Sequence, residues 1–567
     1  MERKKIAIVG GGPSSLFMLK KLIDAGSTDL SIHIFEKGNQ LGAGMPYSLE
    51  GAADEHVTNV SGNEIPELEV AIIDWIKTVH PDTLHRFHID LERFHEYQVL
   101  PRLLFGAYLA DQFKHLEKRA VQAGLELSVS YKSEIVDILD MPEKDQVALI
   151  LADGSKSIHD HVILCSGHLW PKQHEGKVKG YFDSPYPPAK IKLKTNHAVA
   201  IRGASLTAID ALRTLARQHG GYELGKDGML KFQLDEANPN FNIVMHSREG
   251  LLPAIRFHLE ESMLGKDSLF DKKEIDEIRL ANDGFVPLDL VFEEKFKQPL
   301  LERQPALHKE IAGMSMEEFV DHVMELREKL DAFQLFRAEY KEAEKSIKRH
   351  ETIHWKELLG ALSYTLNYPA KYFSAEDMIR LKKKLMPLIS LVIAYVPQSS
   401  AQELLALHDA GVLKLVAVGE DSKVLPQEQG GIQYHYHDED GKQQIVYYET
   451  FIDCIGQPHL PFERIPYPSL KAAGTIVAAK LKFRKDSAAK EMINDNEDIE
   501  IDRDGSYQLK VPGMAINDHF QVVDQYRALN PRIYVMAVPL IGGYNPDYSG
   551  LDFCETAATR IAATLLS

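Results

Sequence analysis

The chain has 567 residues, enough for two to four domains, and its hydrophobic content of 44% is that of an ordinary globular protein. Its net charge of −18 argues against a general nucleic-acid binder, because such proteins need a basic face to neutralise phosphates. The longest apolar run, Leu385–Val396, contains Pro387 and is too short to span a bilayer. The three cysteines lie far apart and form no Cys-x-x-Cys pair. We therefore expect a cytoplasmic protein without structural disulfides and without a nucleic-acid or membrane partner.

The amino-terminal residues follow the order of elements that a dinucleotide site needs. An apolar run, Ile6–Val9, leads into the glycine turn Gly10–Gly12, and a helix start follows near Pro13. A second apolar run, Ile32–Phe35, ends at the acid Glu36. This order predicts a buried strand, a tight turn, a helix and an acid-tipped second strand, as in a Rossmann-like domain.

Each residue type in this stretch suits one part of a dinucleotide. Gly10 permits the sharp turn, and Gly12 lets a pyrophosphate approach the backbone because it has no side chain. The helix near Pro13 directs its free N–H groups and positive dipole end at the phosphates. Glu36 can accept hydrogen bonds from a ribose 2′-OH, while Ser15 replaces the usual third glycine. A glycine turn in another α/β protein is the alternative, but all four features together favour a dinucleotide site.

A second strand, turn and helix follow the same order with a weaker fingerprint. The segment His197–Gly203 resembles the first strand and turn, but Ser205 stands where a glycine usually admits the pyrophosphate. The next predicted strand, Asn242–His246, is followed by Ser247-Arg248 instead of an acid. Arginine at this position suits a 2′-phosphate and favours NADPH over NADH. The alternative is that this arginine is a surface charge and the unit binds no nucleotide.

Two further segments resemble each other and follow the two glycine turns in the same order. His161–Gly167 and Thr450–Gly456 are each an apolar strand that ends in Cys-x-Gly. Each comes after a predicted β-hairpin, with turns near Asp153-Gly154 and Asp440-Gly441. This paired phrase is more specific than either glycine turn alone.

With these segments, the chain resembles the FAD/NAD(P)-binding flavoprotein family, whose wider relatives include flavin-containing monooxygenases and amino-acid N-hydroxylases. The resemblance covers residues 1–255 and about 385–567. The phrases Gly42–Ser48, Thr58–Val60 and Leu100–Arg102 also fit this family. The resemblance implies FAD on the first turn and NADPH (or NADH) on the second.

The resemblance also implies a set of cofactor-binding residues. In the first unit, Glu36 would bind the FAD ribose, Val136 would lie near the adenine, and the N–H groups of Gly550 and Leu551 would face the flavin pyrimidine edge. The set implied for FAD is Gly10, Gly12, Pro13, Ser14, Ser15, Glu36, Lys37, Gly44, Tyr47, Asn59, Arg102, Val136, Ser166, Gly167, Gly550 and Leu551. The set implied for NAD(P) is Gly203, Ser205, Leu206, Thr207, Ser247 and Arg248.

The chain also departs from the family pattern. The last predicted strand runs through Met536–Pro539 without the acid that binds the ribityl chain in many relatives. The redox Cys-x-x-Cys of disulfide reductases is absent. Gly180–Pro187 takes the approximate place of a monooxygenase-type linker phrase, either as a hinge between domains or as a plain proline-rich linker.

Between Phe257 and Leu385 the sequence becomes rich in lysine and glutamate with helical spacing. Phe319, Val323, Leu326, Leu330 and Phe333 recur at three- and four-residue steps and predict one apolar helix face. We expect a helical insertion that caps the flavin cleft, or alternatively a surface or dimerisation module. The apolar run Leu388–Tyr395 then predicts a buried strand.

The predicted architecture is an α/β fold with two Rossmann-like dinucleotide-binding domains, for FAD and NAD(P), and a helical insertion. Its expected segments are 1–195 and 457–567 for the FAD domain, 196–256 and 385–456 for the NAD(P)-like domain, and 257–384 for the insertion.

Two other patterns carry less information. His435 and His437 could begin a metal site, but they lie on one predicted hairpin strand without a third ligand, so we expect no bound metal. His85 and His88 have no assignable role, and the chain contains no Gly-x-Ser-x-Gly or Walker loop.

The leading hypothesis from the sequence is an NAD(P)H-dependent flavin monooxygenase that acts on a small soluble metabolite, including oxygenation at an amine nitrogen. One alternative is a flavin oxidase or dehydrogenase with a degenerate second site. The other is an FAD-binding interaction protein. The sequence leaves the catalytic residues and the oligomeric state open.

Overall fold

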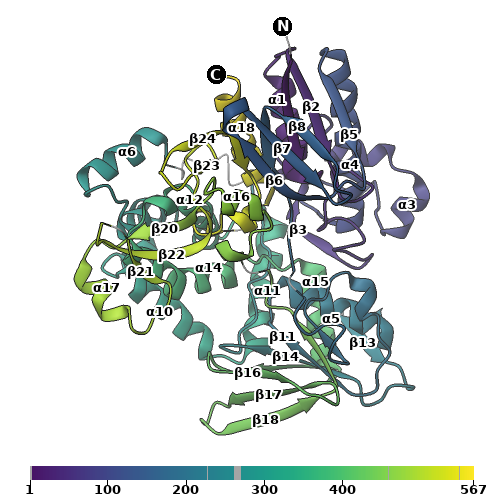
Figure 1. Ribbon diagram of the computed structural model, residues 1–567. Helices are drawn as coiled ribbons and strands as arrows, with labels where there is room; N and C mark the ends of the chain where they lie inside the picture. The colour runs from purple at the N-terminus through teal and green to yellow at the C-terminus, as the bar shows by residue number, and fades with distance from the viewer. Residues whose placement is uncertain are drawn as a thin grey trace.

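A computed structural model describes residues 3–170, 172–226, 228–260, 270–457, 459–502, 504–547 and 550–567. Three bodies are visible in Figure 1: an amino-terminal α/β domain at the top, a second α/β domain at the bottom and a helical body at the left. Within the described ranges, no helix is both long enough and apolar enough to cross a bilayer.

The first domain is built on a six-stranded sheet of order β23-β24-β9-β1-β2-β5. All pairings are parallel except β23 with β24, which closes the edge at the carboxyl end of the chain. The strands are β1 (Lys4–Val9), β2 (Leu30–Phe35), β5 (Glu126–Ser130), β9 (His161–Leu164), β23 (Gln521–Val523) and β24 (Leu529–Val535). The main helices are α1 (Pro13–Asp24), α4 (Arg102–Gln122) and α18 (Gly550–Leu565).

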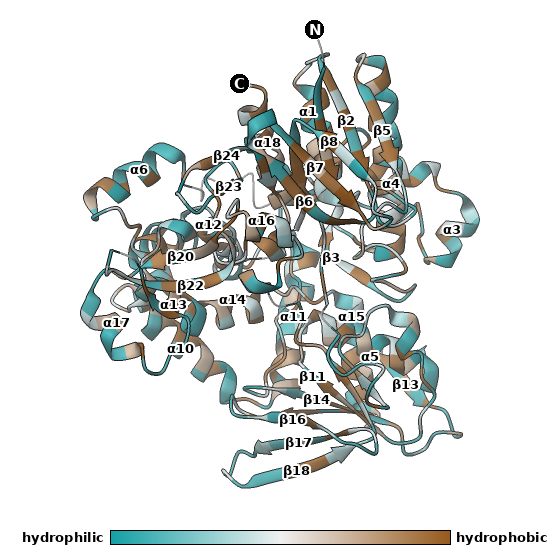
Figure 2. Ribbon diagram, in the orientation of Figure 1, coloured by the Kyte–Doolittle hydropathy of each residue, from teal (hydrophilic) through white to brown (hydrophobic). Residues whose placement is uncertain are grey.

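Smaller elements decorate this domain. A three-stranded antiparallel sheet and a two-stranded pair accompany it, with α16 packed against β6. These elements are β3 (Val57–Ser61), β4 (Val99–Pro101), β6 (Ile135–Met141), β7 (Gln146–Leu151), β8 (Lys156–His159), α2 (Ile72–Trp75), α3 (Pro81–Arg86) and α16 (Pro468–Ala472). Figure 2 shows hydrophobic residues concentrated along strands such as β6 and β7, while α6 in the helical body is largely hydrophilic.

The second domain repeats the plan with a five-stranded parallel sheet of order β10-β19-β11-β14-β15. Its strands are β10 (Tyr181–Phe182), β11 (Ala198–Arg202), β14 (Asn242–Ser247), β15 (Leu413–Ala417) and β19 (Thr450–Asp453), with helices α5 (Leu206–His219) and α15 (Gln398–Asp409). Antiparallel excursions are β12 (Gly220–Leu224), β13 (Leu230–Leu234), β16 (Lys423–Pro426), β17 (Ile432–His437) and β18 (Gln443–Tyr448).

The helical body combines the insertion with a later part of the chain. Its helices are α6 (Lys272–Ala281), α7 (Leu288–Phe292), α8 (Gln298–Arg303), α9 (Pro305–Ile311), α10 (Met316–Glu328), α11 (Ala332–Arg349), α12 (His354–Leu366), α13 (Ala375–Arg380) and α14 (Met386–Val392). The sheet β20 (Ala478–Lys482), β21 (Ile499–Ile501) and β22 (Tyr507–Met514), with α17 (Asp486–Met492), shares their hydrophobic core.

The structure confirms the predicted fold class: two dinucleotide-binding-type α/β domains with a helical insertion. It contradicts the predicted strand at Leu388–Tyr395, since α14 runs to Val392. Leu388, Ile389 and Val392 are buried at helical spacing against the helical core. A short apolar run has no periodicity that separates a strand from a buried helix, which explains the error.

The predicted single apolar face from Phe319 to Phe333 is also wrong in part. The chain forms two helices, and Asp331 begins the second by accepting hydrogen bonds from the backbone N–H groups of Phe333 and Gln334. Leu326 and Leu330 are about half exposed, and Phe333 packs into the core of the second α/β domain instead. An aspartate at the helix start therefore outweighs the continuous apolar spacing.

We predict that Gly10→Ala destabilises the protein by about 1–3 kcal/mol more than Gly124→Ala. Both glycines have positive φ, +104° and +77°. A Cβ on Gly10 would lie 2.6 Å from the carbonyl oxygen of Cys165, whereas a Cβ on Gly124 meets no atom within 4 Å. Urea unfolding measures the difference, and equal destabilisation by the two substitutions would contradict the crowded turn.

Candidate functional site

The first glycine turn lies across three adjacent strands of the amino-terminal sheet. Gly10, at the end of β1, donates its backbone N–H to the Phe35 carbonyl of β2 at 2.8 Å. Its α-carbon faces the Cys165 carbonyl beyond β9, so any side chain would collide there. Sequence positions far apart thus converge on one turn.

The helix that follows this turn has an open amino-terminus. Gly12 is the N-cap of α1 and provides no side-chain cap, and the first turn contains no acidic residue. Its first backbone N–H groups and positive dipole end therefore remain available to an anion. Gly44 backs the turn, because a Cβ on Gly12 would lie 3.4 Å from the Gly44 α-carbon.

Glu36 occupies the predicted position beside the turn. Its carboxylate accepts hydrogen bonds from the backbone N–H groups of Gly11 at 2.7 Å and Gly38 at 2.5 Å. Lys37 points away to Glu134, at 2.9 Å, and Val136 on β6 is 43% exposed. The geometry orients Glu36 next to the phosphate turn, where a ribose would meet it.

The carboxyl-terminal helix α18 returns to this same turn. The Cys554 thiol lies 3.3 Å from the Ser14 hydroxyl on α1, which fixes the start of α18 beside the first turn. Gly550 and Leu551 are the first residues of this helix, and the two residues before them, Tyr548 and Ser549, lie outside the described residues. The structure therefore brings the two predicted parts of the FAD site together.

The second glycine turn has the same construction. Gly203 has a φ of +112°, and its Cβ would lie 2.7 Å from the Cys454 carbonyl oxygen beyond β19. Its backbone N–H donates to the backbone carbonyl of His246 on β14 at 2.7 Å. Ser205 is the N-cap of α5 without a side-chain cap, and again the first turn has no acid. Leu206 and Thr207 begin this helix.

Arg248 lies just beyond the end of β14, at the position predicted for a 2′-phosphate. Its side chain is 53% exposed and only loosely approached by two carboxylates, Glu249 at 3.6 Å and Glu420 at 4.0 Å. Ser247, the last residue of β14, precedes it. The guanidinium is therefore accessible, although two carboxylates partly offset its charge.

Arg102 has a role that the sequence does not reveal. Its guanidinium donates to the Asp210 carboxylate of α5 at 2.5 Å and to the Val57 carbonyl at 3.0 Å. The Tyr186 hydroxyl donates to the same carboxylate at 2.7 Å. Arg102 thus ties the first domain to the second, and its predicted contact with FAD remains a prediction.

The ion pair is held away from water. Burial tends to raise the pKa of Asp210, but Arg102, His56, the Tyr186 hydroxyl and Arg213 together outweigh it and keep this pKa below its usual range. Around it, His56 Nε2 lies 3.0 Å from the Thr214 hydroxyl, which donates to Glu55 at 2.7 Å. A carboxylate seven residues after the second turn is the signal that could have identified Asp210 beforehand.

Tyr47 and Asn59 both make contacts with residues distant in the sequence. Tyr47 packs edge-on against Phe105, and burial raises its pKa to about 12. The Asn59 carbonyl accepts a hydrogen bond from the buried Arg256, which also pairs with Glu64. Ser166 and Gly167 follow Cys165 at the first turn.

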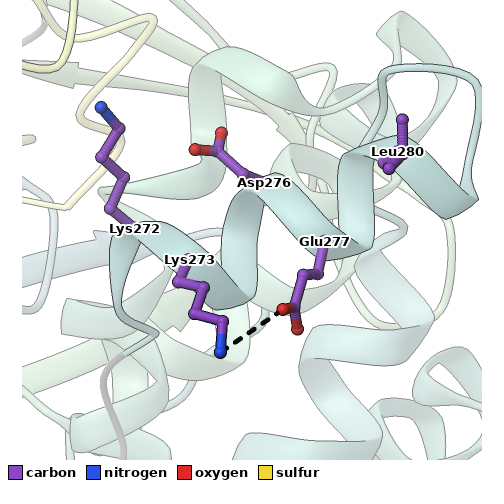
Figure 3. Close-up of a pocket in the computed structure, with 5 residues that line it drawn as sticks. All are labelled: Lys272, Lys273, Asp276, Glu277 and Leu280. Atoms are coloured by element: carbon purple, nitrogen blue, oxygen red, sulfur yellow. Dashed lines mark ion pairs between the residues drawn. The ribbon is translucent and has the colours of Figure 1, made fainter.

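Two other surface features hold no candidate centre. Within the described ranges, no group of three or more His, Cys, Asp or Glu side chains is arranged to hold a metal. Figure 3 shows a shallow pocket formed by α6 alone, where Lys273 pairs with Glu277 at 3.7 Å and Leu280 points outward. Such an exposed charged helix face is ordinary solvated surface.

Comparison with known proteins agrees with this geometry. Residues 7–169 match the family model described as FAD-NAD(P)-binding, and residues 271–393 match that of a YdhS-like middle domain. The uncharacterized protein YdhS of Escherichia coli (strain K12) is 29% identical over 473 residues, which are 82% of this chain and 86% of YdhS.

Two solved structures cover the whole chain and 99% of their own chains at 12% identity. The ornithine N-hydroxylase of Kutzneria sp. 744 has a TM-score of 0.47, and the L-lysine 6-monooxygenase of Pseudomonas syringae has one of 0.49. The amino-terminal domain is therefore similar to the FAD-NAD(P)-binding family. The middle part of the chain is similar to the middle domain of YdhS-like proteins.

We predict that Asp210→Asn costs about 3–5 kcal/mol of unfolding free energy, because it leaves the Arg102 charge buried without a counter-charge. The matched control is Asp54→Asn, which breaks the surface pair with Arg86 and should cost about 1 kcal/mol or less. Side-chain exposure is 15% and 6% in the first pair but 54% and 52% in the second. Similar costs in urea unfolding would contradict the proposed tie between domains.

Proposed function

We propose that this protein is an NAD(P)H-dependent FAD oxidoreductase. The observation that carries the proposal is the duplicated turn: Gly10 and Gly203 each face the carbonyl of a Cys-x-Gly strand, and each precedes a helix with an open amino-terminus. Two such anion sites on two linked α/β domains suit one flavin dinucleotide and one nicotinamide dinucleotide.

The residues of the first site fit FAD. The open first turn of α1 would bind the pyrophosphate, and the Glu36 carboxylate would accept from the adenosine ribose. The amino-terminus of α18 would place its positive dipole end near the flavin pyrimidine edge, where it stabilises negative charge. FAD, when bound, supplies the redox chemistry: it accepts a hydride and passes electrons to a second acceptor.

In the second site, the open first turn of α5 would bind the NAD(P)H pyrophosphate, and the Ser205 hydroxyl could donate to it. Arg248 would pair with a 2′-phosphate, which favours NADPH over NADH. Both turns lie on domains that the Arg102–Asp210 pair joins, so the two dinucleotides would be held in a fixed relation.

For the fate of the reduced flavin, we propose oxygenation of a small soluble metabolite, including at an amine nitrogen, in the cytoplasm. All three cysteines are buried, and burial raises the thiol pKa of Cys554 to about 11 and those of Cys165 and Cys454 well above the usual value. Thiols held protonated are poor nucleophiles, which disfavours dithiol–disulfide chemistry.

A flavin oxidase with an unused second site is the alternative. Ser205 occupies the position of the second-turn glycine, and Glu249 with Glu420 partly offsets the charge of Arg248. In that case the substrate itself would reduce FAD. The further alternative is an FAD-binding protein whose helical body contacts a partner.

The test is anaerobic mixing of the FAD-loaded protein with NADPH and, separately, NADH. We expect flavin bleaching within seconds, faster with NADPH, and expect Arg248→Gln to reduce the NADPH preference by about tenfold through loss of one charge-assisted contact. The NADH rate of the same variant is the internal control and should not change. Absence of bleaching by either nucleotide would refute this function, and failure to take up FAD would refute its first premise.

A further inference from the structure

A small cavity lies where the helical body meets the amino-terminal domain. Its volume is about 90 Å³, and it is separate from both glycine turns. Its walls come from α12 and the short helix η7 (Pro369–Tyr372), from the segment around Asp518, from the loop at Tyr544 and from one face of α18. It is therefore a junction of several segments that lie far apart in the sequence.

Aromatic side chains form most of the walls. Phe520 and Phe553 meet edge to face at 5.8 Å, and the Tyr364 hydroxyl is fixed on α18 by hydrogen bonding with the Thr556 hydroxyl at 2.7 Å. The aromatic set is Phe270, Tyr364, Tyr368, Phe520, Tyr544 and Phe553. Such walls suit the flat or apolar body of a small organic molecule.

Asp518 provides the negative charge of this cavity. Its carboxylate already has an ion-pair partner and two hydrogen-bond donors. It pairs with Lys371 at 2.9 Å and accepts from the hydroxyl groups of Tyr372 at 2.8 Å and Tyr368 at 3.2 Å. Burial tends to raise the pKa of Asp518, but Lys371 and the hydroxyl groups of Tyr372 and Tyr368 together outweigh it and keep this pKa below its usual range. The Asp518 carboxylate is therefore ionised and compensates the charge of Lys371.

Arg560 has no such partner. Its guanidinium carbon lies 4.1 Å from the centroid of the Tyr368 ring, and no hydrogen bond or ion pair joins it to another side chain in the described part of the chain. The nearby Arg279 differs, since Asp276 pairs with it at 3.3 Å. Among the described residues that line the cavity, Arg560 is thus the charged side chain without an ion pair, and the Tyr368 ring fixes the orientation of its planar group.

We propose that this cavity binds a small organic monocarboxylate, whose carboxylate pairs with Arg560 and whose body packs against the aromatic walls. A single uncompensated charge matches a monoanion better than a phosphate dianion. Arginine binds carboxylates through two parallel hydrogen bonds, which adds orientation to the attraction. This site stands independently of the proposed redox function, because its argument uses no cofactor.

Calorimetric titration of the full-length protein with propanoate, and with propanamide as its neutral isostere, tests the proposal. We expect propanoate to bind at least tenfold more tightly than propanamide, and inorganic phosphate not to displace it. Equal affinities for propanoate and propanamide, or competition by phosphate at similar concentration, would overturn the proposal. This comparison on the unmodified protein requires no variant to fold.

Variants then locate the site. Arg560→Gln should weaken propanoate binding at least tenfold and leave propanamide binding unchanged, while Arg560→Lys should restore part of the loss. Arg464→Gln, at an exposed arginine outside the cavity, is the matched control and should have no effect. Retention of propanoate affinity in a folded Arg560→Gln protein, shown by an unchanged unfolding temperature, would place any binding elsewhere and reject this assignment.

Discussion

The ion pair between Arg102 and Asp210 is the constraint on which the arrangement of the two dinucleotide-type domains depends. Burying two charges is costly, and their attraction offsets that cost only when the geometry and the further hydrogen bonds are favourable. Here Tyr186 and the Val57 carbonyl supply those further bonds. Displacement of either domain would leave Arg102 or Asp210 without its oppositely charged partner. The ion pair therefore restricts the relative position of the two glycine turns.

The helical body is likewise held by contacts with both α/β domains. Its helix α11 contributes Phe333, Phe336 and Tyr340 to the core of the second domain, while Tyr364 of α12 bonds to Thr556 on α18 of the first. The buried Arg327 pairs with Glu339 and donates to the Leu252 carbonyl at the exit of the second domain. A body attached on both sides would exclude water between the domains rather than move as a separate module.

The sequence predicted the residues of the two glycine turns, but it did not predict which side chains from distant parts of the chain would pair. Gly10, Gly203 and their Cys-x-Gly partners could be predicted because steric demands at a turn leave few acceptable residues. The spacing of Asp210 from the second turn marks its position but not its partner, since the burial of an acid in a helix and its pairing with Arg102 appear only in the folded chain. The β20–β22 sheet likewise gives no hint that it joins the helical core instead of the adjacent FAD domain. The roles of Asp210 and of the β20–β22 sheet depend on tertiary contacts, which is why the sequence did not predict them.

Several helices of the helical body have capped starts, whereas the two candidate binding helices do not. In the helical body, Asp271, Ser315, Asp331 and Ser374 each cap the helix that follows by accepting its first N–H groups. Helices α1 and α5 lack such caps, a difference of about 1 kcal/mol each. The absence of a side-chain cap alone defines no site, because α12 and α15 also begin without a side-chain cap. What distinguishes α1 and α5 is the glycine turn before each, which keeps side chains away and leaves the unpaired amides open to a phosphate.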